Sequence, residues 1–334
     1  MIEKRIHLGA TDLLVSPLGI GAWAWGDRFF WGYGRQYGHD ESAAAFQTSL
    51  AAGINFFDTA EIYGQGRSER LVGEFIRRYA GESGGPRLVE APQTSGSEQP
   101  VIATKFAPYP WRLFPGQLER ALRGSLKRLQ LEQVALYQIH FPLKIRSLET
   151  WAEALAQAVQ AGLTQAVGVS NYNQKQMIET QRVLQRYELP LASNQVEYSL
   201  LDRAIEANGL LETCRRENIT VIAYSPLAQG LLTGKYTPAN PPGGVRGRRY
   251  DARRLARIQP LIELLRTIGA EHAGPDGEAK TPAQVALNWT ICKGTLPIPG
   301  AKNARQASDN IGALGWRLSG DEVARLDEAS AAVQ

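Results

Sequence analysis

Eight short apolar runs alternate with helical segments along this 334-residue chain. The runs are residues 13–21, 54–58, 101–106, 134–141, 166–172, 191–199, 219–227 and 295–301. Strands that alternate with helices in this way are typical of parallel sheets whose crossover connections are helical. Eight such units predict a closed (β/α)8 TIM barrel, an α/β fold that carries its functional residues at the carboxyl ends of the strands.

The alternation continues without a composition break that would mark a linker, so we expect residues 1–334 to form a single domain. Residues 5–9 and the start of the first run predict an N-terminal hairpin, and the segments 303–314 and 319–330 predict extra C-terminal helices. The aromatic- and glycine-rich segment 21–38 is predicted to be a long loop, and the polar segment 81–100 an insertion outside the core.

Charge and cysteine content exclude several functional classes. The net charge is only +4, and Lys and Arg are not interleaved with aromatic residues, so we expect no nucleic-acid partner. Cys214 and Cys292 are the only cysteines and form no disulfide framework or metal-spaced pair, which suits a reducing compartment. The four histidines lack metal-ligand spacing, so no metal site is expected. Since no apolar span approaches ~20 residues, we expect a cytoplasmic protein that does not enter a membrane.

Titratable side chains stand at the ends of the predicted strands. Asp58 and Tyr63 follow the second strand, Lys105 lies at the end of the third, and His140 ends the fourth. A charge on a buried strand is unfavourable unless it is paired. Taken alone, Asp58 could cap a turn and Tyr63 could pack on the rim. Because a barrel brings all these ends to one mouth, we expect the four side chains to form a catalytic site.

These four residue types suit the reduction of a carbonyl group. Hydride addition leaves an alkoxide, to which Tyr63 can give a proton as general acid. The ammonium group of Lys105 would act to lower the pKa of the phenol, and Asp58 would keep Lys105 charged and oriented. His140 would hydrogen bond to the substrate carbonyl and orient it. The hydride must come from a cofactor, because no side chain can supply one.

The order of the motifs resembles the aldo-keto reductase superfamily over nearly the whole chain. That family has a DxxxxY loop after the second strand, a lysine after the third and a histidine after the fourth, which stand here as FDTAEIYG, ATKF and YQIHFP. GVSN, NQVEYS, AYSPLAQGLLTGKY and IPGAKNARQASDN match later elements, and SPLAQG and PGAKNxxQxxxN resemble the branch of bacterial and plant reductases and potassium-channel β subunits. The resemblance implies a TIM barrel that uses NADPH (NADP+) to reduce aldehydes or ketones, with a small-molecule carbonyl compound as its partner.

The same resemblance implies a set of cofactor-binding residues. Ser170, Asn171 and Gln195 carry the amide and hydroxyl groups that a nicotinamide carboxamide needs, and the ring of Tyr224 could stack on the nicotinamide. The other implied residues are Gly21, Ala22 and Trp23; Ser225, Pro226, Leu227, Gln229, Gly230 and Lys235 at the pyrophosphate; and Gly300, Lys302, Gln306, Asp309 and Asn310 at the adenosine end. Taken singly, each is as readily an ordinary loop or cap residue. No GxGxxG motif is present, which disfavours a Rossmann domain.

Two further functional classes remain open on the sequence. A redox-sensing regulatory subunit would bind the cofactor with little turnover, although the channel β subunits carry Asn where this chain has His140. A barrel isomerase or aldolase would use Lys105 as a Schiff-base nucleophile, which leaves the cofactor pattern unexplained. An apolar or aromatic-tolerant pocket is expected, with a wall that includes Trp23, Trp25, Phe29, Phe30, Trp31 and Tyr109. The sequence leaves the substrate and the oligomeric state open.

Overall fold

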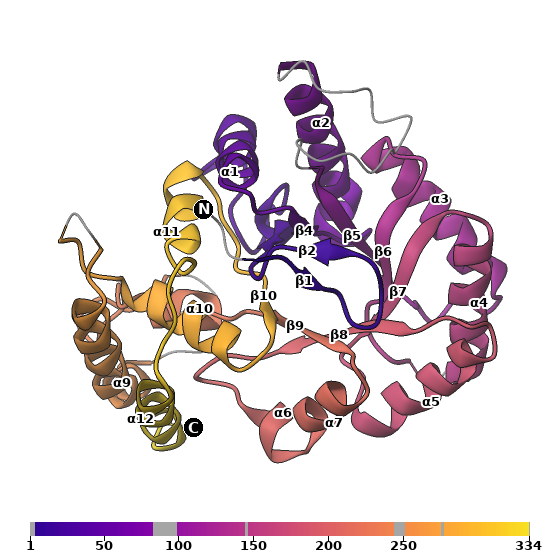
Figure 1. The fold of residues 1–334 in the computed structure, drawn as a ribbon. Coiled ribbons are helices and arrows are strands. Elements are labelled where there is room, and N and C mark those ends of the chain that lie inside the picture. Colours follow the sequence, from indigo (N-terminus) through magenta and orange to yellow (C-terminus); the bar gives the residue numbers. More distant parts are fainter. Residues whose placement is uncertain (1–3, 83–98, 144–145, 244–250, 275–276, 334) are drawn as a thin grey trace.

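The computed structural model describes residues 4–82, 99–143, 146–243, 251–274 and 277–333. In this part of the chain, eight parallel strands form one sheet, in sequence order from β3 to β10. The strands are β3 (Ile20–Gly21), β4 (Phe56–Asp58), β5 (Val101–Phe106), β6 (Val134–Ile139), β7 (Thr164–Ser170), β8 (Leu191–Glu197), β9 (Thr220–Tyr224) and β10 (Leu296–Pro297). Gly19 N donates to Pro297 O (2.9 Å) and Gly21 N to Pro299 O (3.1 Å). These bonds join the first strand to the last and close the predicted barrel (Figure 1).

Helices surround the sheet on its outer side (Figure 1). They are α1 (His39–Ala51), α2 (Arg67–Glu82), α3 (Gly116–Leu129), α4 (Leu148–Gln160), α5 (Gln174–Gln185), α6 (Ala204–Ala207), α7 (Leu210–Arg216), α9 (Ala252–Glu271), α10 (Pro282–Cys292), α11 (Ala304–Ile311) and α12 (Gly320–Ala331). Their buried faces follow the helical spacing of the sequence; in α3, for example, Leu118, Leu122 and Leu126 all point inward. No helix of the described residues is long and apolar enough to span a membrane.

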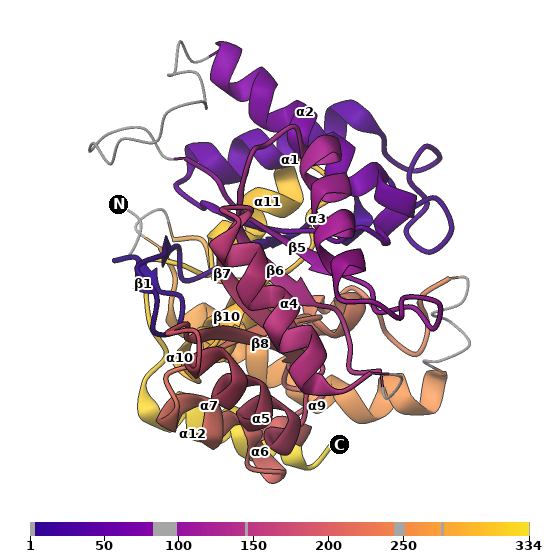
Figure 2. The same ribbon diagram turned by 90° about the vertical axis from the view of Figure 1, so that its right-hand side faces the viewer.

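The N-terminal hairpin closes one end of the barrel. Its strands, β1 (Ile6–His7) and β2 (Leu14–Val15), pair in antiparallel fashion. Gly9 N donates to Thr220 Oγ1 (2.7 Å), and Ser16 N donates to Asn55 Oδ1 (2.8 Å). Since these partners stand at or just before the first residues of β9 and β4, the hairpin covers the amino ends of the strands (Figure 2). The opposite end carries the loops that follow the strands.

The observed elements differ from the pattern of the sequence in the first and last strands and in one helical segment. The apolar runs 13–21 and 295–301 give β3 and β10, which have two residues each. The helix-forming segment 204–218, which alone would favour one continuous helix, is divided into α6 and α7, because Gly209 between them has a left-handed backbone with φ +75°. Most of the predicted insertion, residues 83–98, lies outside the described residues.

Candidate active site

A cavity of about 1420 Å³ opens at the carboxyl ends of the strands. Asp58, Tyr63, His140, Asn171 and Tyr224 all line it, although they follow or end four different strands, β4, β6, β7 and β9. Pockets for single small molecules are roughly 300–1,000 Å³ in volume, so this cavity has room for a larger ligand or for two ligands together.

The alternation of side chains along β4 and β5 brings Asp58 and Lys105 into contact. Phe56 and Ala103 pack in the apolar cluster inside the barrel. Two residues later on each strand, Asp58 and Lys105 point to the same side because side chains alternate with a period of two. Thr104, between Ala103 and Lys105, points the other way and its hydroxyl donates to a carboxylate of α2. The two strands therefore place a carboxylate and an ammonium group side by side at the floor of the cavity.

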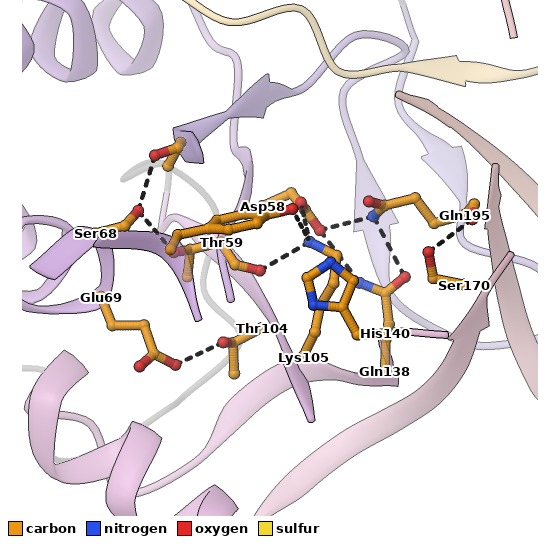
Figure 3. A network of polar contacts seen from close by, with 12 residues as sticks. Asp58, Thr59, Ser68, Glu69, Thr104, Lys105, Gln138, His140, Ser170 and Gln195 are labelled. Carbon is orange, nitrogen blue, oxygen red and sulfur yellow. Dashed lines mark hydrogen bonds and ion pairs between the residues drawn. The ribbon is translucent and has the colours of Figure 1, made fainter. Parts of the chain in front are cut away.

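Lys105 is fully buried and has three oxygen acceptors (Figure 3). Its ammonium group donates to the Asp58 carboxylate, to Thr59 O (2.8 Å) and to Tyr63 OH (3.4 Å). A buried charge is tolerated only when it is paired and hydrogen bonded, and these contacts meet both requirements. The ammonium therefore links the carboxylate of Asp58 to the phenol of Tyr63.

Amide groups satisfy the other oxygen of Asp58. Gln195 Nε2 donates to Asp58 Oδ1 (2.8 Å) and Gln138 Nε2 donates to the same atom (3.2 Å). Figure 3 shows both side chains directed toward Asp58, Gln138 from β6 and Gln195 from β8, although neither strand is adjacent to β4 in the sheet. Gln195 was predicted to contact a cofactor, but an N–H of its amide group already donates to the Asp58 carboxylate.

Burial and the charge of Lys105 act on the pKa of Tyr63 in opposite directions. Burial raises the pKa of Tyr63, the Lys105 ammonium lowers it, and Asp58 raises it again, so that the pKa lies above its ordinary value of 10.0. The lowering effect predicted for Lys105 is present, but burial outweighs it. For Lys105 itself, burial lowers the pKa, but Asp58 and Tyr63 raise it by more, so the ammonium stays charged.

His140 is held as a neutral imidazole. Burial, together with the charge on Lys105, lowers the pKa of His140 to about 3. Its ring lies edge-on to the ring of Tyr63, with 5.6 Å between ring centroids. Its Nδ1 atom is buried and has no hydrogen-bond partner among the described residues. A polar atom left in this way beside a cavity is suited to a ligand.

The ends of β6 to β9 are linked by hydrogen bonds through Asn171. Asn171 Nδ2 donates to His140 O (3.2 Å) and Ser170 Oγ (3.1 Å), and its Oδ1 accepts from Tyr224 OH (3.0 Å). Ser170 Oγ donates to Gln195 O (2.8 Å). Asn171 has a left-handed backbone with φ 61°, a conformation that Asn tolerates better than most residues. The residues predicted to bind the nicotinamide are therefore joined by hydrogen bonds and form one wall of the cavity.

The loop after β9 has an unusual backbone. Ser225, Ala228 and Gln229 have φ values of 50°, 47° and 55°, and Gly230 has φ 96°. Only glycine adopts such angles without strain, and strained residues persist where the surroundings hold them, often at ligand sites. The segment includes the short helix η3 (Ala228–Thr233), and Lys235 beyond it places its ammonium 4.8 Å from the ring centroid of Tyr236.

Lys302 connects the segment after β10 to the aromatic loop after β3. Its Nζ donates to Trp31 O (3.0 Å) and lies 5.1 Å from the ring centroid of Trp31 and 4.7 Å from that of Tyr37. Its backbone N donates to Gln306 Oε1 (2.9 Å), and Asn310 Nδ2 donates to Gly300 O (3.3 Å). Lys302 also stands immediately before the N-cap of α11.

The cavity brings together nearly all residues predicted for the site. Each predicted cofactor residue lines it except Ala22, which is buried behind the wall and whose carbonyl accepts from Ser68 Oγ (2.8 Å). Lys105 lies beneath the cavity rather than on its surface. Other residues that were not predicted also line the cavity, among them Gln36, Tyr37, Lys280, Thr281, Gln284, Asn303 and Ser308. Lys280 and Thr281 could have been found in the sequence because they stand at the N-terminus of a helix, which is a favourable position for an anion.

The model of the "Aldo/keto reductase family" matches residues 17–331. The chain belongs to this family. Among aldo-keto reductases and related enzymes, it is 42% identical over 335 residues to pyridoxal reductase, chloroplastic, of Arabidopsis thaliana, covering 98% of this chain and 86% of the relative. It is 28% identical over 341 residues to L-glyceraldehyde 3-phosphate reductase of Escherichia coli (strain K12), covering 96% and 91%.

Solved structures give the same family. The glycerol dehydrogenase from Gluconobacter oxydans superposes with a TM-score of 0.81 at 25% identity, covering 99% of this chain and 96% of that one. An aldo/keto reductase from Klebsiella pneumoniae, solved in complex with NADP and acetate, superposes with a TM-score of 0.69 at 26% identity, covering 98% and 95%. The predicted barrel and the predicted family are both confirmed.

Proposed function

We propose that this aldo-keto reductase binds NADPH (NADP+) in the cavity and reduces aldehydes or ketones to alcohols. The observation that carries the proposal is the Lys105 ammonium, which contacts both the Asp58 carboxylate and the Tyr63 phenol at the floor of the cavity. The neutral His140 ring stands next to that phenol. An acid, its charged neighbour and a hydrogen-bonding group thus lie at one point of a cavity large enough for a dinucleotide.

The donors along the cavity fit this cofactor. At one end, Ser170 Oγ and Asn171 Oδ1 each accept one hydrogen bond within the protein and can accept a second from the carboxamide N–H groups of a nicotinamide. At the other end, Lys302 and the first turn of α11 offer a charge and backbone N–H groups. The left-handed residues of the loop after β9 would hold the pyrophosphate between them, and Lys235 would add a charge. When bound, the nicotinamide supplies the hydride.

The side chains at the floor of the cavity would move the proton. Because its pKa is raised, Tyr63 carries its proton at neutral pH and can donate it to the oxygen of a carbonyl as that oxygen becomes an alkoxide. Lys105 would stabilise the phenolate that remains, and Asp58 keeps Lys105 charged. His140, neutral at the same pH, would donate a hydrogen bond to the carbonyl oxygen and orient it.

The two other functional classes fit the site less well. A Schiff-base nucleophile must reach its substrate as a free amine, whereas Lys105 is fully buried, does not line the cavity and has a raised pKa. A regulatory subunit with little turnover would not need His140 and Tyr63 in edge-to-face contact above Lys105. Turnover is therefore the function that the geometry supports best.

We propose an aromatic aldehyde as the substrate type. Trp23 stacks on Tyr63 at 5.9 Å between centroids, with 28° between the ring planes, and both residues line the cavity, so that an aromatic ring stands in the wall beside the proposed acid. The relative from Arabidopsis thaliana is named a pyridoxal reductase, and pyridoxal is a flat aromatic aldehyde.

A carbonyl panel tests the proposed function. Pyridoxal, benzaldehyde and glyceraldehyde are each mixed with the protein and NADPH, and loss of NADPH absorbance is recorded. We expect turnover with the two aromatic aldehydes to exceed turnover with glyceraldehyde. Tight NADPH binding without oxidation by any of the three would instead support the regulatory class. Covalent trapping by borohydride, lost in Lys105→Met, would support the Schiff-base class.

A further inference from the structure

A nearly buried ion pair joins the loop that carries Tyr63 to the next loop of the barrel mouth. Glu61, two residues before Tyr63, pairs with Arg112, and the side chains are only 9% and 18% exposed. Neither residue lines the cavity among the described residues. A ligand in the cavity would therefore not contact the pair, which can affect the site only through the loops that it joins.

The contacts of this pair form a closed set. Arg112 Nη1 donates to Glu61 Oε1, and Arg112 Nη2 donates to Glu61 Oε2 (3.0 Å), which makes the pair bidentate. Ala107 N donates to the same Oε1 (2.7 Å), and Arg112 Nη1 donates to Ala107 O (2.8 Å). Glu61 thus accepts a hydrogen bond from the backbone N–H of Ala107 in the second loop, and Arg112 donates one to the carbonyl of the same residue.

Aromatic rings fix the guanidinium group in this position. It lies 4.7 Å from the ring centroid of Phe106, at the end of β5, and 5.4 Å from that of Tyr109. Tyr109 in turn stacks on Trp111 at 4.6 Å between centroids. An arginine held between rings and a carboxylate loses less freedom on pairing than an exposed one, so the geometry of the pair is well defined.

This arrangement controls the distance between Lys105 Nζ and Tyr63 OH, which is near the upper limit for a hydrogen bond. Lys105 stands on β5 just before Phe106 and Ala107, and Tyr63 stands two residues after Glu61. The two ends of the Glu61–Arg112 pair are therefore anchored next to the two ends of the bond from Lys105 Nζ to Tyr63 OH, which is 3.4 Å long. A further shift of about 1 Å would break that bond, and displacements of this size can lower turnover ~10²-fold.

We propose that Glu61 and Arg112 form a clamp that holds the Tyr63 loop against β5 and so keeps the phenol at Lys105. The inference rests on the proposed function, in which Tyr63 is the acid. Both residues are positioning residues: they act through the loops after β4 and β5. Loss of the clamp should slow the chemical step of each folded molecule without changing its affinity for NADPH.

The test compares three clamp variants with a matched control. Arg112→Met removes the charge and the two-pronged contact, Arg112→Lys keeps the charge alone, and Glu61→Gln keeps an acceptor for Ala107 N. The control is Arg123→Met, which removes an ion pair with Glu119 whose side chains are 58% and 46% exposed on the surface of α3. Each protein is loaded with NADPH and mixed with an excess of the best aldehyde of the panel in a stopped-flow instrument.

The single-turnover rate constant decides between positioning and mere stability. We expect it to fall roughly ten- to a hundredfold in Arg112→Met and by less in Arg112→Lys, with the dissociation constant of NADPH unchanged and Arg123→Met equal to wild type. A loss of amplitude at an unchanged rate constant would mean fewer folded molecules and would overturn the proposal. So would a rate constant in Arg112→Met equal to that of wild type.

Amide hydrogen exchange separates failure of the clamp from failure of the proposed function. Peptides covering residues 58–66 and 101–112 should exchange faster in Arg112→Met than in Arg123→Met, whether or not the protein reduces aldehydes. If the wild type reduces none of the panel but both peptides exchange faster, the proposed function is wrong and the clamp stands. Unchanged exchange in both peptides would overturn the clamp itself.

Discussion

Lys105 shows how a single buried charge can organise a site. Removing an ammonium group from water costs several kcal/mol, and only a well-made set of partners offsets that cost. Here Asp58 provides the opposite charge and Thr59 a carbonyl, while Tyr63 completes the set at a longer distance. The weakest of these contacts is the one that the proposed proton transfer would use, so it is the one most open to change by neighbouring residues.

Replacing Tyr63 by Phe should remove the acid and little else. We expect Tyr63→Phe to lower kcat at least ~10²-fold, because general-acid catalysis contributes ~10²–10⁴-fold. NADPH binding, followed by fluorescence quenching, should stay near the wild-type value. Reduction of a good aldehyde by the Phe variant at the wild-type rate would assign the proton to another donor.

Lys302→Ala should separate the two nicotinamide cofactors. Lys302 stands at the end of the cavity where the adenosine of the cofactor is expected, and we expect its ammonium group to contact the 2′-phosphate of NADPH. Such a charge-assisted contact is worth ~1.5–3 kcal/mol, so NADPH affinity should fall roughly ten- to a hundredfold. NADH lacks this phosphate and serves as the control. Because Lys302 also donates to Trp31 O, equal weakening of both cofactors would show that it acts through the aromatic loop instead. Fluorescence titration of both proteins with both cofactors gives the answer.

Residue by residue, the sequence revealed the groups with recognisable chemistry and missed those that support them. Asp58, Lys105 and His140 could be found because each ends a buried apolar run. Glu61 and Arg112 could not, because the partners are 51 positions apart and neither stands in a recognisable pattern. Ala22 was expected to contact a cofactor, but its small side chain faces the core. The pKa of Tyr63 depends on how deeply the phenol is buried. The burial of a loop residue cannot be inferred from the residues next to it in the sequence.

At the scale of elements, strands were predicted well where the chain runs apolar without interruption, as in β5 to β9. The run 13–21 is divided into β2 and β3, which have two residues each, and Pro17, which has no backbone N–H to donate to a ladder, lies between them. β10 is equally short: it ends at Pro297, and Pro299 follows two residues later. The break between α6 and α7 depends on the backbone angle of Gly209, which a run of helix-forming residues conceals.

His39 joins α1 to α2 and should make stability depend on pH. Its Nε2 contacts Glu74 Oε1 (2.9 Å) and its Nδ1 contacts Asp40 Oδ1 (3.0 Å). The hydrogen bond to Asp40, with a further contribution from Glu74, raises the pKa of His39 above its ordinary value of 6.5. The folded state therefore binds this proton more tightly, and the stabilisation is fully present below pH 6.5 and lost as the pH rises through the higher folded value.

The pH dependence can be measured on Glu74→Gln by urea unfolding at about pH 5.5 and about pH 8.5. We expect the variant to be less stable than wild type at the lower pH and to differ less at the higher one. Glu119→Gln, which removes an exposed carboxylate paired with Arg123 instead of a histidine, is the control and should show no such trend. A constant difference at both pH values would remove His39 from the explanation.

At the scale of the whole molecule, the cavity lies across the seam at which the barrel closes. Gly21 and Gly300 bridge the first and last strands, and both line the cavity. This bridge is a single pair, whereas β3 with β4 and β9 with β10 are each paired at two positions, so the seam is the shortest pairing of the sheet in the described part of the chain. A ligand in the cavity touches both sides of this seam and should hold them together.

Cofactor binding should therefore protect the seam first. With NADPH at about 100 times its dissociation constant, linkage stabilises the fold by ~2.7 kcal/mol, which a rise in Tm would report. Exchange of the Gly19 and Gly21 amides, which bond across the seam, should slow by more than exchange of Leu8 N in the hairpin at the opposite end. Equal slowing at both ends would mean that binding acts on global unfolding alone.

The seam also has a consequence for the fate of the protein in a cell. A barrel that opens at one place exposes its interior to proteases there, and degradation follows the population of the opened form when opening is fast relative to cleavage. NADPH that spans Gly21 and Gly300 would reduce that population in proportion to its occupancy. The half-life of the chain would then follow the supply of reduced and oxidised cofactor, and cells short of NADP(H) would hold less of the protein even at unchanged synthesis.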